Sequence, residues 1–330
     1  QFVNSVFILI VVASTSLSYA NPIVVQKFDS VDYLRYCKFS PDNAKVLAAG
    51  IKKHDGLLFV YDLNQKAILT YAGHVKYGSG INCMSFSSDG RMVLSGGNSY
   101  TALLWDANTG ETLHEFKFGD ELVPFFVESV CITKDSKYAI IAAKGYIHVF
   151  DLVNFELITK FKIDSVITDL ESYNTSDKLV VRSVSGVSVV DLFGKILFKI
   201  DSYPGYLTSD NRFMFFLKSD QNRMIGIAKY DANNGNLLSI SDPFDPVKGI
   251  SGQNYVFIST GDAFLVRKTN RIMEWNKHKK VVDVVNNEGV PVNLQSFSND
   301  DQYVSAIEGN TLYIYATQDL LSLATSYNSY

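Results

Sequence analysis

The chain has 330 residues, of which 47% are hydrophobic and 19% charged, a balance that is typical of a folded globular protein and excludes a disordered one. Its net charge is −4 without a long run of either sign, which excludes a general nucleic-acid-binding protein because such proteins need a basic surface. Its 22 Phe and 19 Tyr favour strands, and no long segment has the apolar period of a helix. We therefore predict an all-β protein.

The first twenty residues contain an apolar run at 6–13 and small polar residues that end at Ala20. This pattern is typical of a secretory signal peptide cleaved after Ala20, and the run is too short to span a bilayer. Tyr19-Ala20 is also in phase with the repeat described next, so residues 6–20 could instead form extra strands. The first alternative predicts a secreted or lumenal protein without a stable membrane span, and the second is compatible with a cytoplasmic one.

From residue 33 onward, a two-residue motif recurs at intervals of 40 to 45 residues. It consists of an aromatic or β-branched residue followed by Asp or a substitute for Asp. Its copies are Tyr61-Asp62, Trp105-Asp106, Phe150-Asp151, Val190-Asp191, Tyr230-Asp231, Trp275-Asn276 and Tyr315-Ala316. Such self-similarity indicates a repeat architecture, in which each unit buries one face against its neighbours.

A second motif precedes the first one in most units, as in 39–42 and 86–90. It consists of Ser or Thr shortly before Asp. It lies between two apolar runs, which is typical of a hairpin. In the second unit, a strand ending at Asp106 and another from Thr112 to Phe118 follow. Four short strands in roughly 42 residues are the content of one propeller blade.

Residues 78–118 resemble a repeat of the WD-repeat β-propeller family through 81–90, 94–97 and 103–106, with Gly73-His74 just upstream. The resemblance covers about residues 23–330 and is weakest in 244–287. It implies one domain, 21–330, that forms a seven-bladed β-propeller of four-stranded antiparallel blades. The blades are expected at about 33–73, 78–118, 126–163, 165–203, 204–243, 244–287 and 288–330.

The resemblance also implies a buried hydrogen-bonded set of His, Ser, Asp and Trp. His74, Ser95 and Trp105 match three of these positions, and Ser99 stands where the family has Asp. We interpret His74, Ser95, Trp105 and Asp106 as structural residues.

Closing the ring requires a strand that completes the last blade, because an open array leaves exposed edges. Residues 23–28 read as a fourth strand, and we predict that they lie beside Thr311 to Tyr315. The tail from Leu320 to Ala324 is the alternative candidate for this strand.

The sequence contains no phosphate-binding glycine loop, no nucleophile elbow and no paired-histidine motif. Cys37, Cys83 and Cys131 lack metal-ligand spacing and are expected to be buried thiols. We interpret Asp169 and Glu171 as an ordinary charged pair in solvent. We therefore predict a protein that is not an enzyme and uses no cofactor or metal.

Loops held by a rigid scaffold are the usual place for binding residues. We predict that partner-binding loops share one face, with exposed aromatic side chains as anchors; the alternative is that these rings pack beneath their own loops. The candidate residues are Lys53, His54, Phe125, Phe126, Asn222, Arg223 and Phe244. Asn174 begins a glycosylation sequon.

Our leading functional hypothesis is a non-enzymatic scaffold that binds one or more partner proteins or peptides and no nucleic acid. One alternative is a secreted or lumenal enzyme or ligand binder that uses the central channel. The other is a structural subunit of a larger assembly.

Overall fold

The computed structural model describes most of the chain. The described residues are 21–71, 74, 80–98, 100–118, 126–173, 175, 177–202, 205–208, 211–219, 225–241, 255–257, 263–266, 271–274, 280–283 and 291–326. The proposed signal peptide and the sequon residue Asn174 lie outside these ranges.

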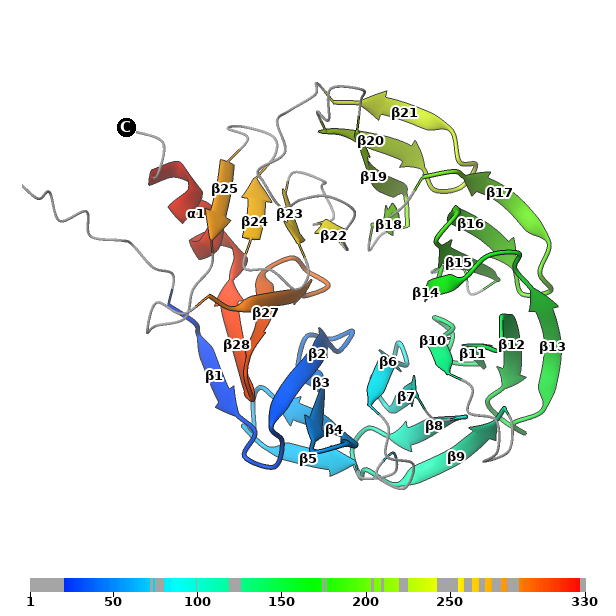
Figure 1. The fold of residues 1–330 in the computed structure, drawn as a ribbon, viewed down its shortest axis with the longest axis horizontal. Coiled ribbons are helices and arrows are strands. Elements are labelled where there is room, and N and C mark those ends of the chain that lie inside the picture. The colour runs from blue at the N-terminus through cyan, green and yellow to red at the C-terminus, as the bar shows by residue number, and fades with distance from the viewer. Residues whose placement is uncertain are drawn as a thin grey trace, which may run out of the picture.

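The described residues form seven four-stranded antiparallel sheets, which Figure 1 shows side by side around a centre. Blades 1 to 4 follow chain order from the innermost to the outermost strand. Blade 1 has β2 (Tyr33–Phe39), β3 (Lys45–Lys52), β4 (Asp55–Asp62) and β5 (Ile68–Tyr71). Blade 2 has β6 (Ile81–Phe86), β7 (Met92–Gly97), β8 (Thr101–Asp106) and β9 (Thr112–Lys117). Blade 3 has β10 (Val127–Ile132), β11 (Tyr138–Ala143), β12 (Tyr146–Asp151) and β13 (Leu157–Lys162), and blade 4 has β14 (Ile167–Ser172), β15 (Lys178–Ser183), β16 (Gly186–Asp191) and β17 (Ile196–Ile200).

The remaining three blades include one that is built from both ends of the chain. Blade 5 has β18 (Gly205–Leu207), β19 (Phe213–Ser219), β20 (Ile225–Asp231) and β21 (Leu237–Ile240), and blade 6 has β22 (Tyr255–Phe257), β23 (Ala263–Val266), β24 (Arg271–Glu274) and β25 (Lys280–Asp283). Blade 7 has β26 (Asn293–Phe297), β27 (Tyr303–Glu308), β28 (Thr311–Ala316) and β1 (Val24–Lys27). The predicted class, an all-β propeller of four-stranded antiparallel blades, is confirmed.

The recurring Asp at the end of the third strand holds the turn that follows it. Asp106 Oδ1 accepts hydrogen bonds from the backbone amides of Asn108 and Thr109, both at 2.8 Å. These backbone hydrogen bonds stabilise the carboxylate and lower the pKa of Asp106. Asp62, Asp151, Asp191 and Asp231 accept equivalent bonds. The repeated motif therefore reflects a turn whose backbone amides need a side-chain acceptor.

The second motif, Ser or Thr shortly before Asp, stabilises the turn between the first two strands of a blade. Ser40 Oγ donates to Asp42 Oδ1 at 2.5 Å and accepts from the Lys45 amide at 2.9 Å. The next position is left-handed: Asn43 has a φ of 58°, and Gly90 has a φ of 68° at the same place in blade 2. A residue without a Cβ adopts this conformation without strain.

In blades 1 to 4, where the structure describes both motifs, they lie at the same end of the antiparallel blade. We call that end the Asp-turn face. The turns between second and third strands, and the links from one blade to the next, lie at the other end. We call that end the loop face. The ring thus presents two faces of different chemistry, one with Asp-capped turns and one with variable loops.

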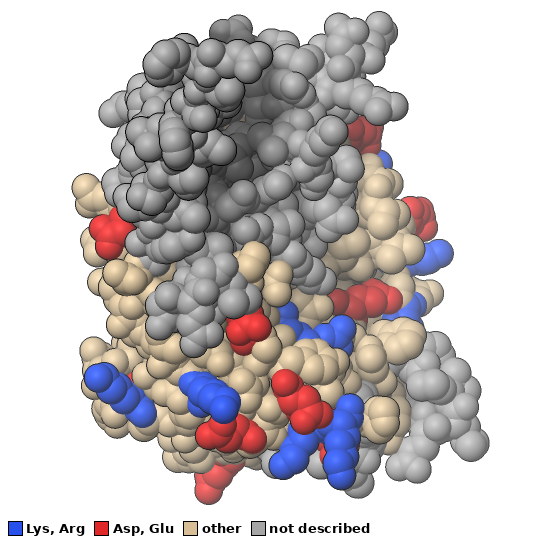
Figure 2. Space-filling view, turned by 60° about the vertical axis from the view of Figure 1, so that its left-hand side comes forward, with Lys and Arg blue, Asp and Glu red and all other residues tan. Residues whose placement is uncertain are grey.

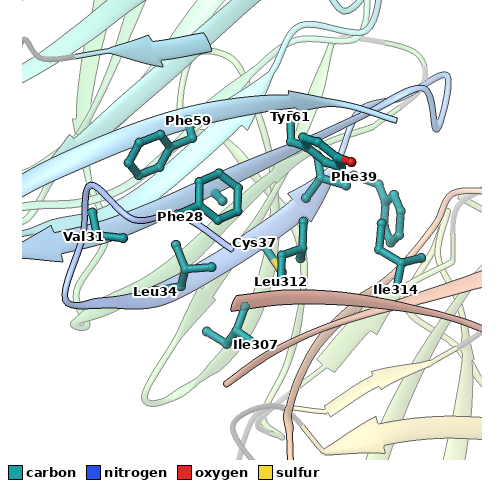
Figure 3. Close-up of a cluster of buried hydrophobic side chains, with 12 residues drawn as sticks. Phe28, Val31, Leu34, Cys37, Phe39, Phe59, Tyr61, Ile307, Leu312 and Ile314 are labelled. Atoms are coloured by element: carbon teal, nitrogen blue, oxygen red, sulfur yellow. The ribbon is translucent and has the colours of Figure 1, made fainter. Parts of the chain in front are cut away.

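The core is divided into clusters that lie between neighbouring sheets. One cluster joins blades 7 and 1 and contains Phe28, Leu34 and Phe59 with Leu312 and Ile314 (Figure 3). Each buried side chain of this size contributes roughly 1.5–3 kcal/mol, so the contacts between sheets stabilise the ring.

The pairing of β1 with β28 completes blade 7. Val24 lies opposite Ile314 and Lys27 opposite Thr311, so Val24–Lys27, within the predicted segment 23–28, form a strand at the predicted place. The alternative was wrong: Leu320 to Ala324 lie in helix α1 (Thr317–Ser326). The spacing of Leu320, Leu323 and Ala324 suits a helical face, and Leu320 is fully buried against blade 7.

The side of the ring in Figure 2 carries basic and acidic side chains interspersed among uncharged ones. The described part of this side therefore has no extended field of one sign. Cys37, Cys83 and Cys131 lie on the innermost strands β2, β6 and β10 as free thiols, and Cys37 and Cys131 are buried.

Candidate interaction face and the polar networks behind it

The loop face carries the predicted partner-binding residues that the structure describes. Lys53 and His54 lie exposed in the turn between β3 and β4 of blade 1. The Lys53 amide donates to Asp32 Oδ2 at 2.7 Å, which fixes this turn against the link from β1. Phe126 lies just before β10 of blade 3, and 58% of its surface is exposed. Phe125, Asn222, Arg223 and Phe244 lie outside the described residues.

Phe126 presents a large aromatic ring to solvent next to a buried strand. The neighbouring Val127 is only 1% exposed, so the backbone at this point is held by the core. A fixed aromatic side chain loses little conformational entropy on binding, which is why such residues often anchor partners. Phe126 is therefore an exposed candidate anchor on the loop face.

His74, Ser95 and Trp105 form a buried hydrogen-bonded chain. Trp105 Nε1 donates to Ser95 Oγ at 2.8 Å, and His74 Nε2 lies 2.8 Å from the same oxygen. Tyr71 packs edge-on against Trp105 with ring centroids 5.2 Å apart. The three residues tie the link after blade 1 to β7 and β8, whereas Ser99 lies outside the described residues.

Because His74 is buried in this hydrogen-bonded network, we predict that the protein loses stability in mild acid. Burial, opposed by the charge of Glu115, lowers the pKa of His74 from 6.5 to about 4. The unfolded chain therefore binds a proton first as the pH falls, and stability that is complete above pH 6.5 is lost towards pH 4. At pH 5 we expect a loss of roughly 2 kcal/mol from His74, since one pKa unit corresponds to ~1.4 kcal/mol.

The measurement is urea unfolding at pH 7 and pH 5. Burial also lowers the pKa of His148 to about 4, so wild type will lose stability through both rings. The variant His74→Asn keeps only the His148 contribution and should lose less between the two pH values. An equal loss in wild type and variant contradicts the assignment to His74.

Asp169 and Glu171 are not an ordinary solvated pair, and that interpretation was wrong. Both carboxylates contact Arg182, whose side chain is only 5% exposed. Arg182 Nη1 lies 3.1 Å from Asp169 Oδ2, and Nη2 donates to Glu171 Oε2. The two acids are 48% and 39% exposed, so they connect a buried cation to solvent.

The same arginine joins three blades near the innermost strands. Arg182 Nε donates to the Gly205 carbonyl of blade 5, and its guanidinium lies 5.5 Å from the ring centroid of Tyr206. Ser129 Oγ of blade 3 donates to Asp169 Oδ1 at 3.3 Å. The carboxylates and the neighbouring hydrogen bonds compensate the charge, which keeps Arg182 protonated despite burial.

The described residues contain no group of three or more His, Cys, Asp or Glu side chains placed to hold a metal ion. Among these residues, too, no helix combines the length and hydrophobicity needed to cross a bilayer.

Comparison with known proteins places the sequence signal in blades 1 and 2. Residues 65–106 match the WD domain, G-beta repeat family. The chain is 27% identical over 132 residues to WD repeat-containing protein 1 of Xenopus tropicalis, a match that covers 39% of this chain and 21% of that protein. The chain therefore contains a segment that matches a WD repeat.

Two further relatives match a similar share of this chain. Small ribosomal subunit protein RACK1 of Neurospora crassa and MST50-interacting protein 11 of Pyricularia oryzae are each 27% identical over 138 residues, or 41% of this chain and 39% of theirs. The chain thus matches about a fifth to two fifths of the length of these curated relatives.

A solved structure extends the likeness in fold to nearly the whole chain. The β-propeller domain of Cps50 (Swd1) from Myceliophteria thermophila superposes with a TM-score of 0.68 at 16% identity, covering 90% of this chain and 99% of that one. At this identity the likeness concerns the fold alone.

Proposed function

We propose that this protein is a non-enzymatic scaffold whose seven-bladed ring binds a partner protein or peptide on its loop face. The observation that carries the proposal is Phe126, an aromatic side chain that is 58% exposed beside a fully buried residue. Exposed Lys53 and His54 lie on the same face and extend the candidate surface to blade 1.

The names of two relatives support a role in assemblies. One is named as a protein of the small ribosomal subunit, and another as an interacting protein. Phe125, Asn222, Arg223 and Phe244 belong to the proposed surface because they lie in the corresponding turns and links of the sequence repeat.

The proposal predicts that Phe126→Asp abolishes capture of a partner that wild-type protein retains in affinity purification. A carboxylate at this position removes the apolar anchor and adds a charge that must be desolvated on binding. We expect the partner to fall at least roughly tenfold in quantitative mass spectrometry, the change that a loss of ~1.4 kcal/mol produces.

Val153→Asp is the matched control. Val153 is 87% exposed and lies in the turn between β12 and β13, on the Asp-turn face of blade 3. This variant should retain the partner. Capture that is unchanged by Phe126→Asp, or is lost equally in both variants, argues against the loop face.

A further inference from the structure

A hollow opens on the loop face where blade 3 meets blade 4. It has a volume of about 440 Å³ and is lined by Glu128, Gly145 and the segment 162–167. Glu128 lies at the start of β10, Gly145 lies in the turn between β11 and β12, and the segment links β13 to β14. All three elements reach the same end of the ring. Along the sequence, Glu128 follows the exposed Phe126 by two residues.

Glu128 brings an unsatisfied acceptor to this hollow. Its Oε1 atom accepts a long hydrogen bond of 3.4 Å from the Gly145 amide. Its Oε2 atom is buried, and no described residue donates a hydrogen bond to it. Burial raises the pKa of Glu128, as expected for a carboxylate that is removed from water without a cation. A buried acceptor of this kind is destabilising until a donor reaches it.

The nearest basic side chain on the wall of the hollow has another partner. Lys162 Nζ lies 3.6 Å from Asp164 Oδ1, and both side chains are largely exposed. With Glu128 ionised, the wall carries two acids and one base. This imbalance favours a ligand with one positive charge.

Part of the rim of the hollow is apolar, since Ile163, Val166 and Ile167 belong to its lining. Val166 is 66% exposed and Val184 is 61% exposed, and the Val184 amide donates to the Val166 carbonyl at 3.1 Å. An apolar rim above a carboxylate suits a side chain that has an aliphatic stem and a cationic end.

We propose that this hollow binds an arginine side chain presented by the partner, with the guanidinium against Glu128 and the stem against the apolar rim. Arginine fits better than lysine because its planar fork can donate to both carboxylate oxygens, and because a guanidinium is more weakly hydrated than an ammonium group. The inference rests on the loop face proposed above and adds the chemistry of the group that docks there.

The test uses N-acetyl-arginine amide as the probe and the backbone amide of Gly145 as the NMR reporter, since this amide donates to Glu128. We expect a saturable shift of the Gly145 signal with the arginine compound. Its neutral citrulline analogue should give none, because the two side chains have nearly the same shape and differ in charge. No saturable shift, or an equal response to citrulline, overturns the proposal, and a stronger response to N-acetyl-lysine amide overturns the choice of arginine.

Variants of the two acids make the test specific. Glu128→Gln should weaken binding of the probe roughly tenfold or more, because it removes the charge that pairs with the guanidinium. This variant should fold, since it replaces a buried unpaired charge by a neutral group. Asp164→Asn, at an exposed position paired with Lys162, should bind within about twofold of wild type. Unchanged binding by Glu128→Gln overturns the proposal.

Partner capture separates this proposal from the scaffold function. If Phe126→Asp loses the partner and Glu128→Gln retains it fully, the loop face stands and the arginine site is wrong. If both variants lose the partner while Val153→Asp retains it, both proposals are supported.

Discussion

Replacing Arg182 by alanine will lower the free energy of unfolding by about 3 kcal/mol, because removal of one partner from a buried ion pair is strongly destabilising. The change also leaves the Gly205 carbonyl without its donor and removes the cation between Asp169 and Glu171. The measurement is equilibrium unfolding in urea at pH 7. We expect a lower midpoint with little change in the slope.

Two matched variants define the cause of that loss. Arg182→Lys keeps the charge but cannot reach three acceptors with a planar fork, so we expect an intermediate loss of about 1–2 kcal/mol. Arg91→Ala removes an exposed arginine from a turn of blade 2 and should change stability by less than about 0.5 kcal/mol. If Arg182→Ala unfolds at the same urea concentration as Arg91→Ala, the network does not join the blades as described.

Replacing Phe28 by alanine will destabilise the junction between blades 7 and 1 by about 3–5 kcal/mol, the usual range for a large buried aromatic residue. Phe28 is 1% exposed, and its ring centroid lies 5.0 Å from that of Phe59. Its amide also donates to the Asn310 carbonyl at 3.0 Å. The variant should therefore loosen the pairing of β1 with β28, which urea unfolding and hydrogen exchange of the β28 amides both measure.

Val25→Ala in β1 is the control, because the Val25 side chain is 52% exposed. We expect a change within about 1 kcal/mol and protected β28 amides. Equal exchange in the two variants, or a Phe28→Ala protein as stable as wild type, contradicts the role of this junction in closing the ring.

The repeat and its turns were predictable because their causes are local. A short acceptor side chain such as Asp106 satisfies amides two and three residues later, so the need appears directly in the sequence. The closing strand was predictable from its alternating pattern. Helix α1 was missed because ten residues with four apolar side chains also fit a strand, and packing of Leu320 against blade 7 decides between the two.

The polar networks were less predictable because they depend on strand register. Asp169 lies opposite Arg182 only because the pairing of β14 with β15 shifts between Ile167 and Asp169. Glu128 is separated by 17 residues from the amide that contacts it, and its burial depends on how blade 3 meets blade 4. The spacing of residues in the sequence predicts neither the pairing of Asp169 with Arg182 nor the contact of Glu128 with the Gly145 amide. The position of Lys53, His54 and Phe126 at the loop end of their blades was predictable from the order of strands and loops.

Site-specific photo-crosslinking tests the central claim most directly. A benzophenone side chain is placed at position 126 on the loop face or at position 153 on the Asp-turn face, and the partner is then crosslinked in the native complex. We expect one crosslinked partner from position 126 and none from position 153. Crosslinking from position 153 alone would contradict the account, because the partner would then bind the opposite face of the ring.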